Sequence, residues 1–378
     1  MKVTQTKLSL PKIILVAPRT PANGAAGIEQ YVLNLSTFFS RKGCNTEVWG
    51  TDSHFSEKKS GSVTWKSFPG WNPGDAFYFS PALFNALHHS NADIIHANGF
   101  NNLTTIAALL AKKPHQKLVV TLNSSPPSSP FTKALRTPYE WLFRLLSHRF
   151  DKIICVSKNE HSIFTHMLNL PREKYAIIPN GVEASTFTAL KVKKKDHQIL
   201  LIGRMVPNKG HVRVINALPL IQKIFPQVKL HLVGSGPLEN ELKTCVKKLA
   251  LENSVVFHGN IPVSKRADMI RFLKESTLLV LLSDYEGNPL VLGEGLAAGI
   301  PLVVSDKGVM HEYVERGDAT GIVDIDNPRV VAETLSRVLA TPAKFKGKHH
   351  PQSWDDVGES VWSVYEKLVQ KSNAALYE

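Results

Sequence analysis

The chain has 378 residues, 43% of them hydrophobic and 20% charged, which is typical of a soluble globular protein with room for two domains. No stretch approaches the roughly 18 consecutive apolar residues of a membrane span, and the N-terminal segment lacks the apolar core and cleavage site of a signal peptide. We therefore expect a cytoplasmic protein. Its three cysteines and 15 histidines show no spacing typical of disulfide frameworks or metal sites, so we expect no metal.

The net charge of +13 is concentrated in the first half of the chain. Residues 1–190 contain 20 Lys and Arg against 11 Asp and Glu, a net charge of +9. Such an excess suits anionic partners such as lipid headgroups, polyphosphate or nucleic acid, although solvated basic surfaces without such a role are also common. The basic residues are not interleaved into any recognised DNA-binding or RNA-binding module, so nucleic acid is the partner we expect least.

The first elements alternate between strand and helix. Residues 12–17 form an apolar run that predicts a strand, and apolar residues then recur at helical spacing from Ile28 until Gly43 ends the helix. Residues 47–50 predict the next strand. This pattern indicates a β/α domain, in which ligands bind at the carboxyl ends of the strands, and Gly27 lies in the first such loop.

Two further buried strands are predicted at residues 93–97 and 117–122. Polar residues mark their ends: His96 and Asn98 lie at the end of the first, and Asn123 follows the second. These positions suit contacts to a ligand. A histidine at a strand end can equally be a core residue, and the sequence leaves both interpretations open.

Residues 126–150 begin with Pro and Ser and continue with arginines interleaved among Trp, Phe and Leu. A basic amphipathic segment of this kind can lie in a membrane interface beside anionic lipid. It can also form a domain helix whose apolar face packs on the sheet while its arginines face solvent. We favour the domain helix and keep peripheral contact with an anionic membrane, at its inner face, as a hypothesis.

The first domain continues with a predicted strand at residues 151–157, a helix at 158–168 and a rigid Pro-Asn-Gly turn within residues 177–182. The run KVKKKD at residues 191–196 predicts a charged surface linker. We therefore place the domain boundary between residues 190 and 191.

The second domain opens with a strand at residues 199–203 that ends in glycine. Arg204 and Lys209 follow, five positions apart, ahead of a helix that starts near Val212. Two cations so placed can converge on one diphosphate, which Arg binds bidentately and Lys binds as a point charge.

The next two predicted strands also end at candidate ligand contacts. Residues 229–233 are followed by Gly234 and Gly236, where a backbone can approach a ligand closely. Residues 255–259 form the following strand, which contains His258.

The most informative stretch runs from residue 279 to residue 306. An apolar run predicts a strand at residues 279–282, a loop follows at 283–288, and Pro289 opens a helix that ends at Gly299. The free N–H groups at such a helix start attract an anion, and phosphate is favoured by the helix dipole. These N–H groups belong to Gly287, Asn288, Leu290 and Val291.

Two carboxylates frame this helix start, Glu286 in the loop and Glu294 in the helix, eight positions apart. A carboxylate repels phosphate but accepts hydrogen bonds from two vicinal sugar hydroxyls. Acids on either side of an anion site therefore suit a nucleotide sugar, which carries hydroxyls at both ends and a diphosphate between them.

The sequence around these acids resembles a known family. The E-x7-E spacing within SDYEGNPLVLGEGLAAGIPLV, and the IIPNGV run at residues 177–182, are similar to the retaining GT-B glycosyltransferases of the glycogen-synthase and mannosyltransferase-like group, family GT4. The resemblance covers nearly the whole chain. Gly295 stands where the family usually has Ala.

The resemblance implies an α/β fold of the GT-B type, with two doubly wound Rossmann-like domains that face a central cleft. Residues 1–190 would form the acceptor-side domain and residues 191–353 the nucleotide-sugar donor domain. A C-terminal helix within residues 354–378 would return to the first domain.

The resemblance also implies roles for the candidate residues. Glu286 would hold the donor sugar, and Glu294 the ribose. Arg204 and Lys209 would offset the charge on the leaving nucleoside diphosphate without a metal. The remaining donor-binding residues would be Gly27, Gly234, Gly236, Gly287, Asn288, Pro289, Leu290 and His258.

The acceptor side departs from the family pattern. Relatives commonly have His-x-His at the end of one strand and a histidine after the next, whereas this chain has His96, Asn98 and Asn123. Relatives also carry two adjacent glycines in the first loop, where this chain has Ala26 before Gly27. In relatives the missing histidines lie on the acceptor side, so their replacement leaves the donor residues intact and changes the acceptor residues. The double-glycine turn lies beside both the donor phosphate and the acceptor.

The implied function is retaining transfer of a hexose from a UDP-, GDP- or ADP-sugar to a glycan, lipid-linked or small-molecule acceptor, without a cofactor, in polysaccharide or glycolipid biosynthesis. Two alternatives stay open. One is a sugar-nucleotide epimerase. The other is a catalytically altered relative that binds a nucleotide sugar and docks on a membrane or partner.

Overall fold

The computed structural model describes residues 10–20, 27–71, 78–124, 130–262 and 265–374. The chain divides into two compact units. The first unit comprises Met1–Pro179 and Trp354–Glu378, and the second comprises Asn180–Ser353. Within the described ranges, none of the helices combines the length and apolarity that a membrane span requires.

The first unit is built on an eight-stranded sheet in the order β3-β4-β2-β1-β5-β6-β7-β8. All neighbouring strands pair in parallel except β3 and β4, which are antiparallel. The strands are β1 Lys12–Arg19, β2 Asn45–Asp52, β3 Ser56–Ser60, β4 Val63–Pro69, β5 Ile94–Asn98, β6 Lys117–Thr121, β7 Lys152–Cys155 and β8 Tyr175–Ile177.

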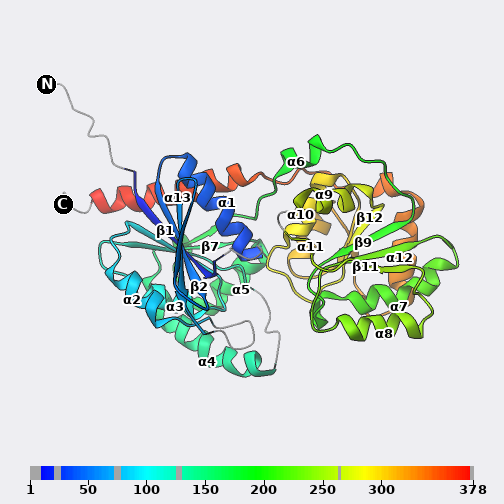
Figure 1. The fold of residues 1–378 in the computed structure, drawn as a ribbon, viewed down its shortest axis with the longest axis horizontal. Coiled ribbons are helices and arrows are strands. Elements are labelled where there is room, and N and C mark those ends of the chain that lie inside the picture. The colour runs from blue at the N-terminus through cyan, green and yellow to red at the C-terminus, as the bar shows by residue number, and fades with distance from the viewer. Residues whose placement is uncertain (1–9, 21–26, 72–77, 125–129, 263–264, 375–378) are drawn as a thin grey trace. The chain divides into compact units, whose positions relative to one another are not determined.

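Helices cover both faces of this sheet. They are α1 Gly27–Arg41, α2 Pro81–His89, α3 Leu103–Ala111, α4 Pro130–Leu146, α5 Lys158–Leu168 and α13 Trp354–Ala374, with short 3-10 turns at Ser147–Arg149 and Arg172–Lys174. One core joins α2, α3, α4 and α5 to the strands. On the other face α13, red in Figure 1, lies along α1, where Tyr365 packs on Phe39 and Trp354 on Tyr31.

His96 joins the sheet of the first unit to its last helix. Its side chain is fully buried, its Nδ1 lies 2.6 Å from the hydroxyl of Tyr365 on α13, and its Nε2 lies 2.8 Å from the hydroxyl of Thr121 on β6. Burial lowers the pKa of His96 to about 3, so the ring is neutral at physiological pH. Both ring nitrogens are therefore engaged within the core.

The second unit has a six-stranded parallel sheet in the order β11-β10-β9-β12-β13-β14. This is the doubly wound order, in which the chain starts at the centre, winds to one edge and then returns to wind to the other. The strands are β9 Gln198–Ile202, β10 Lys229–Val233, β11 Val255–Phe257, β12 Leu278–Leu281, β13 Leu302–Ser305 and β14 Thr320–Ile322.

Successive side chains of these strands point to opposite faces, which gives the second unit two cores. Ile199 and Leu201 of β9 join the core under α7, α8 and α12, whereas Leu200 joins the core under α6, α9, α10 and α11 (Figure 1). The helices are α6 Ala184–Ala189, α7 His211–Gln222, α8 Glu239–Lys248, α9 Arg266–Glu275, α10 Leu290–Ala298, α11 Val309–Glu315 and α12 Pro328–Ala340, with 3-10 turns at Pro207–Lys209 and Pro342–Phe345. The prediction of two Rossmann-like α/β domains is confirmed.

The two units divide earlier than the charged linker suggests. Residues 180–190, expected in the first domain, belong to the second unit. Val182 pairs with Ser353, and Phe187 of α6 is buried in the core that contains α10. Burial of apolar side chains attaches these residues to the second unit, and the charged run at 191–196 does not mark the boundary. The division therefore falls after Pro179.

Gly295 is explained by the packing of α10. A Cβ at this position would lie 2.5 Å from Cδ2 of Leu302 and 3.0 Å from Cδ2 of Leu279, both on the sheet beneath the helix. Such distances are too short for carbon atoms in contact. The glycine therefore lets α10 sit closer to β12 and β13 than alanine would.

Replacing His96 by Gln tests whether a neutral histidine is built into the first unit. Below the ordinary pKa of 6.5, the unfolded chain takes up a proton that folded His96 refuses until about pH 3. The contribution of His96 to the free energy of unfolding is therefore complete above pH 6.5. It is lost as pH falls below that value, by up to about 1.4 kcal/mol per pH unit. Denaturant unfolding between pH 4.5 and pH 8 should show the stability difference between wild type and H96Q shrinking on acidification. A difference that stays constant over this range would contradict it.

Candidate active site

The predicted donor residues gather around the point where strand order reverses in the second sheet. β9 and β12 are neighbours there, although the chain runs through β10 and β11 between them. The loops that leave the carboxyl ends of these two strands lead to helices on opposite faces of the sheet. Doubly wound sheets bind ligands in the crevice between two such loops. The loop after β9 carries Arg204 and Lys209, and the loop after β12 carries Glu286.

Close backbone contact holds these two loops together. Gly210, at the start of α7, has a φ of +73°, and a Cβ there would lie 2.2 Å from the carbonyl oxygen of Leu282. Asp284 N–H donates to the carbonyl of Asn208 at 2.8 Å. Only glycine fits this position, because it tolerates the positive φ and the missing Cβ leaves room for the neighbouring loop.

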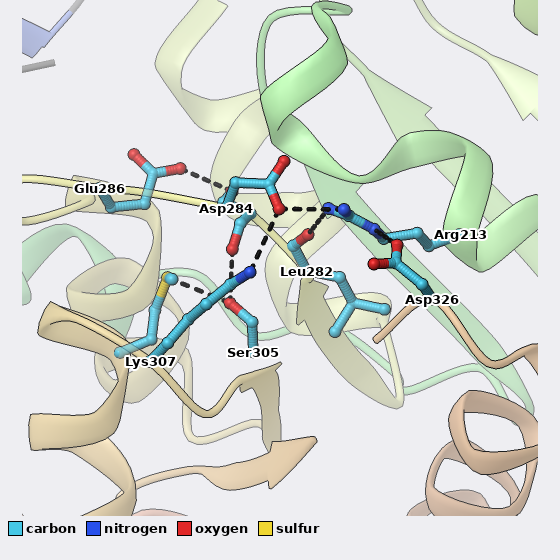
Figure 2. Close-up of polar contacts among 9 residues, drawn as sticks. Arg213, Leu282, Asp284, Glu286, Ser305, Lys307 and Asp326 are labelled. Atoms are coloured by element: carbon cyan, nitrogen blue, oxygen red, sulfur yellow. Dashed lines mark hydrogen bonds and ion pairs between the residues drawn. The ribbon is translucent and has the colours of Figure 1, made fainter. Parts of the chain in front are cut away.

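Arg213 of α7 holds the loop after β12 in place through its side chain (Figure 2). Its guanidinium donates to the carbonyl of Leu282 at 2.9 Å, to Asp284 at 2.9 Å and to Asp326 at 2.7 Å. Lys307 adds a second cation to Asp284 at 3.2 Å. These charges hold the pKa of Asp284 below its usual value despite partial burial, so the carboxylate stays ionised.

Within this frame, Lys209 and Glu286 meet. Lys209 Nζ lies 2.5 Å from Oε1 of Glu286, and the hydroxyl of Ser283 donates to the same oxygen at 2.7 Å. The side chain of Glu286 is only 10% exposed and that of Lys209 is 23% exposed. The structure thus brings together Glu286, predicted to bind the donor sugar, and Lys209, predicted to bind phosphate.

Arg204 is anchored through a hydrogen bond of its backbone carbonyl, while its side chain is exposed. The side chain is exposed at the end of β9, and its carbonyl accepts a hydrogen bond from Val206 N–H at 2.9 Å. In the part of the chain that the structure describes, no ion pair engages its guanidinium. This exposed cation adds positive charge to the loop that also carries Lys209.

Glu294 lies in the body of α10 and not at its surface. It is 7% exposed, and its Oε1 lies 2.6 Å from Nη1 of Arg266 on α9. Burial raises the pKa of Glu294, and the opposing effect of Arg266 is smaller. With a rise of 1.5 Å per residue, Glu294 stands about 6 Å along the helix from Leu290.

The start of α10 has the open donors of an anion site. Pro289 is its N-cap residue and offers no side-chain hydrogen bond to the helix. Asn288 is fixed by two hydrogen bonds, from Tyr313 Oη to its side chain at 3.2 Å and from Asn180 Nδ2 to its carbonyl at 3.0 Å. Gly287 precedes this anchored residue, and Leu290, the first residue of α10, follows it by two positions. The anchor therefore holds the first N–H groups of α10 in place.

Gly234 and Gly236 have a packing role in the structure. A Cβ on Gly234, whose φ is +130°, would lie 2.1 Å from the carbonyl oxygen of Gly203. A Cβ on Gly236 would lie 2.5 Å from the carbonyl oxygen of Met205. The turn after β10 is thus pressed against the loop that carries Arg204, and direct approach of a ligand stays a prediction.

His258 follows β11 and lines a cavity of about 490 Å³ together with Asn260, Arg271 and Phe272. Its Nε2 lies 2.8 Å from Nδ1 of His231, and its ring packs on Phe272 with centroids 4.4 Å apart. The cavity is large enough for an aromatic base. The contact of His258 with the donor nucleotide stays a prediction.

The predicted residues of the first unit behave differently from one another. Gly27 begins α1, with open space around the position of a Cβ, so its contact with the donor stays a prediction. His96 is a core residue, as its two buried hydrogen bonds show. Ala26 lies outside the described residues.

Asn98 and Asn123 leave two polar atoms unused at neighbouring strand ends. Asn98 Nδ2 donates to the carbonyls of Val16 and His96 at 3.2 and 3.0 Å. Among the described residues, Asn98 Oδ1 and Asn123 Nδ2 are buried without a hydrogen-bond partner. Buried polar groups are usually paired, so one acceptor and one donor are left for a ligand or water.

Two cations of the site could not be recognised as such from the sequence. Arg213 and Arg266 each contact a site residue that is distant along the chain, and neither belongs to a spaced motif. In the described part of the chain there is no group of three or more His, Cys, Asp or Glu side chains arranged to hold a metal ion.

Comparison with known proteins places these features in a family. The family model for glycosyl transferases group 1 matches residues 183–352, and the model for glycosyltransferase family 4 matches residues 25–186. The chain belongs to the group 1 glycosyltransferases. The resemblance drawn from the sequence is therefore confirmed.

Individual relatives agree with this membership. The chain is 27% identical to an Escherichia coli UDP-Gal:alpha-D-GlcNAc-diphosphoundecaprenol alpha-1,3-galactosyltransferase, over 60% of each protein. It spans between 48% and 61% of the length of the first curated relatives it matches. Among solved structures, sucrose-phosphate synthase of Thermosynechococcus elongatus superimposes with a TM-score of 0.78 at 19% identity, covering 96% of this chain and 100% of that one. HepE of Anabaena, solved with UDP and glucose, gives 0.72 at 18% identity, covering 94% and 99%. The likeness shows a shared GT-B fold.

Replacing Arg213 by Lys tests the fastening of the site loop. Lysine keeps the charge but cannot reproduce three hydrogen bonds in fixed directions, so the free energy of unfolding should fall by about 1–2 kcal/mol. Replacing Lys307 by Gln removes an exposed partner of the same Asp284 and should change it by less than about 0.5 kcal/mol. Denaturant unfolding of the two variants checks the contrast. Equal effects would show that Arg213 acts only as a surface charge.

Proposed function

We propose that this group 1 glycosyltransferase transfers a hexose from a nucleotide-diphosphate sugar with retention of anomeric configuration. The observation that carries the proposal is the contact between Lys209 and Glu286 at the switch point of the second sheet. A cation that can bind phosphate, Lys209, and a carboxylate that can bind sugar hydroxyls, Glu286, are adjacent there. The start of α10 follows directly in the chain. These are the groups that a sugar diphosphate requires where its sugar meets its phosphates.

Each group has a distinct task in the proposed complex. Arg204, Lys209 and the first N–H groups of α10 bind the diphosphate. Glu286 accepts hydrogen bonds from hydroxyls of the donor sugar, and Glu294 accepts them from the ribose. His258 lies beside the base. Binding at both ends positions the anomeric carbon, which lowers the entropic part of the barrier.

The reaction breaks the bond between the anomeric carbon and the β-phosphate oxygen and forms one between that carbon and an acceptor oxygen. The departing phosphate takes the proton of the acceptor hydroxyl, which balances the step. Negative charge grows on the leaving diphosphate as the bond breaks, and Arg204, Lys209 and the dipole of α10 stabilise it. We propose that these groups do so without a metal.

The donor is proposed to be a UDP-, GDP- or ADP-sugar. Similarity to HepE, whose structure contains UDP and glucose, supports UDP-sugars as the first to test. Thermal shift with each of the three donors identifies the base, because a ligand at one hundred times its Kd stabilises the folded protein by about 2.7 kcal/mol.

Three glutamate variants separate the two ends of the donor. Replacing Glu286 by Gln should weaken UDP-sugar binding and lower kcat/KM by about a hundredfold. UDP should bind at least as tightly as to wild type, because Glu286 contacts the sugar part of the proposed donor and its neutralisation releases Lys209 for the phosphates. Replacing Glu294 by Gln should weaken UDP and UDP-sugar alike. Glu315→Gln, an exposed change on α11, is the matched control.

Calorimetric titration and a transfer assay with and without acceptor measure these effects. Donor consumption only in the presence of acceptor supports transfer, whereas interconversion of the donor without acceptor indicates an epimerase. Binding of donor with no turnover under either condition indicates a module that only holds the nucleotide sugar. Variants of Glu286 and Glu294 that lose UDP equally would overturn the assignment of the two ends.

For the acceptor we propose a lipid-linked substrate presented at the cytoplasmic face of an anionic membrane. The support comes from α4, which has two apolar faces. Tyr139 and Phe143 are buried in the core, while Trp141 and Leu145 are 66% and 54% exposed beside the exposed Arg144. An aromatic and a leucine one turn apart, next to a cation, suit a membrane interface.

Sedimentation with vesicles tests this surface. Wild type should bind phosphatidylglycerol vesicles more tightly than phosphatidylcholine vesicles, and Trp141→Ala should reduce that binding about tenfold, because a large apolar side chain leaves the interface. Trp71→Ala is the matched control, since Trp71 is 68% exposed in the same unit but lies outside α4. Equal losses from the two variants, or no binding by wild type, would contradict membrane docking through α4.

A further inference from the structure

Arg266 is built into the structure around Glu294. It is the first residue of α9, and its Nη1 lies 2.6 Å from Oε1 of Glu294 on α10. On its other side, the guanidinium carbon lies 5.8 Å from the ring centroid of Phe187 on α6. The side chain of Arg266 is 26% exposed. Three helices therefore fix the guanidinium between an aromatic ring and a carboxylate.

The position of Arg266 is unfavourable without that carboxylate. The first turn of a helix carries a partial positive charge, which repels a cation. Conversely, Glu294 is 7% exposed, and a buried carboxylate requires a partner to stay ionised. Among the described elements that pack on α10, α6 and β13 contain no charged residues. Helix α9 carries Arg266, Asp268, Arg271, Lys274 and Glu275, and of these Arg266 forms the ion pair with Glu294. The two residues therefore depend on each other.

We propose that Arg266 is a positioning residue for the donor: it keeps Glu294 ionised and fixes its orientation, so that the carboxylate accepts hydrogen bonds from the ribose hydroxyls. This inference rests on the proposed role of Glu294 at the ribose. It adds to that role a residue outside the spaced glutamate motif, on a different helix.

The chemistry of the carboxyl group explains why its charge matters. Both oxygens of a carboxylate accept hydrogen bonds, whereas a protonated carboxyl group turns one oxygen into a donor and loses that acceptor. Burial already raises the pKa of Glu294, and Arg266 opposes the rise. Without Arg266 the pKa moves higher, so the carboxyl group takes up its proton at a higher pH than in wild type, and contact with the ribose is lost sooner as pH falls.

The experiment compares a nucleotide with its 2′-deoxy form. UDP, GDP and ADP are titrated calorimetrically into wild type, and the tightest of the three is then measured beside its 2′-deoxy analogue between pH 5.5 and pH 8.5. The ratio of the two affinities reports the ribose hydroxyl alone, because ionisation of the phosphates affects both ligands equally. Arg266→Gln and Arg266→Lys are tested, with the exposed Arg329→Gln on α12 as the charge-matched control.

In wild type the 2′-hydroxyl should improve affinity about tenfold near neutral pH, as expected for a hydrogen bond to a charged group. In Arg266→Gln this advantage should disappear at low pH and return at high pH, with a midpoint at higher pH than that of wild type. Arg266→Lys should restore much of the advantage at neutral pH, and Arg329→Gln should match wild type.

An Arg266→Gln variant whose affinity ratio follows the wild-type pH profile would overturn the proposal. So would a ratio that is lowered equally at every pH and is not rescued by lysine, because that pattern indicates a purely structural residue. Wild type that binds none of the three nucleotides would overturn the proposed function, and the role of Arg266 with it.

Discussion

The site depends on one constraint, the contact between two loops that leave neighbouring strands β9 and β12. Gly210 has no room for a Cβ because the carbonyl of Leu282 lies where it would be, and Arg213 donates to that same carbonyl. With the loops pinned in this way, Lys209 and Glu286, 77 residues apart in the chain, are brought to 2.5 Å. A doubly wound sheet supplies the crevice, and the glycine and the arginine determine how closely its two sides approach.

The same region balances its charges before any ligand arrives. Glu286 is paired with Lys209, and Glu294 with Arg266, so neither acid is left buried and uncompensated. In the proposed complex Lys209 exchanges Glu286 for the phosphates, Glu286 turns to the sugar hydroxyls, and Arg266 stays paired with Glu294. Because these charged side chains already lie close to the positions they take in the proposed complex, they need to move little on binding. Groups arranged in this way favour electrostatic stabilisation of a leaving diphosphate.

Sequence patterns predicted the parts of the structure that are local. Apolar runs and turn residues located most of the strands and several of the helices, among them α1, α5, α7 and α10. The spacing of Arg204, Lys209, Glu286 and Glu294 indicated a diphosphate flanked by sugars, which stays a prediction. The hairpin of β3 and β4 was missed, because SEKKS at Ser56–Ser60 is an exposed edge strand without apolar alternation. The partners Arg213 and Arg266 could not be predicted, since their contacts arise only from strand order and helix packing. His96 shows the same limit, because a strand-end histidine becomes a core residue only when Tyr365 of the last helix covers it.

The central claim is that a nucleotide sugar binds at the switch point of the second sheet, and a crystal structure with bound UDP tests it most directly. The account predicts diphosphate oxygens within about 3 Å of Lys209 Nζ and of the first N–H groups of α10, with ribose hydroxyls against Glu294. A nucleotide bound elsewhere in the second unit, with Lys209 still paired only to Glu286, would contradict it.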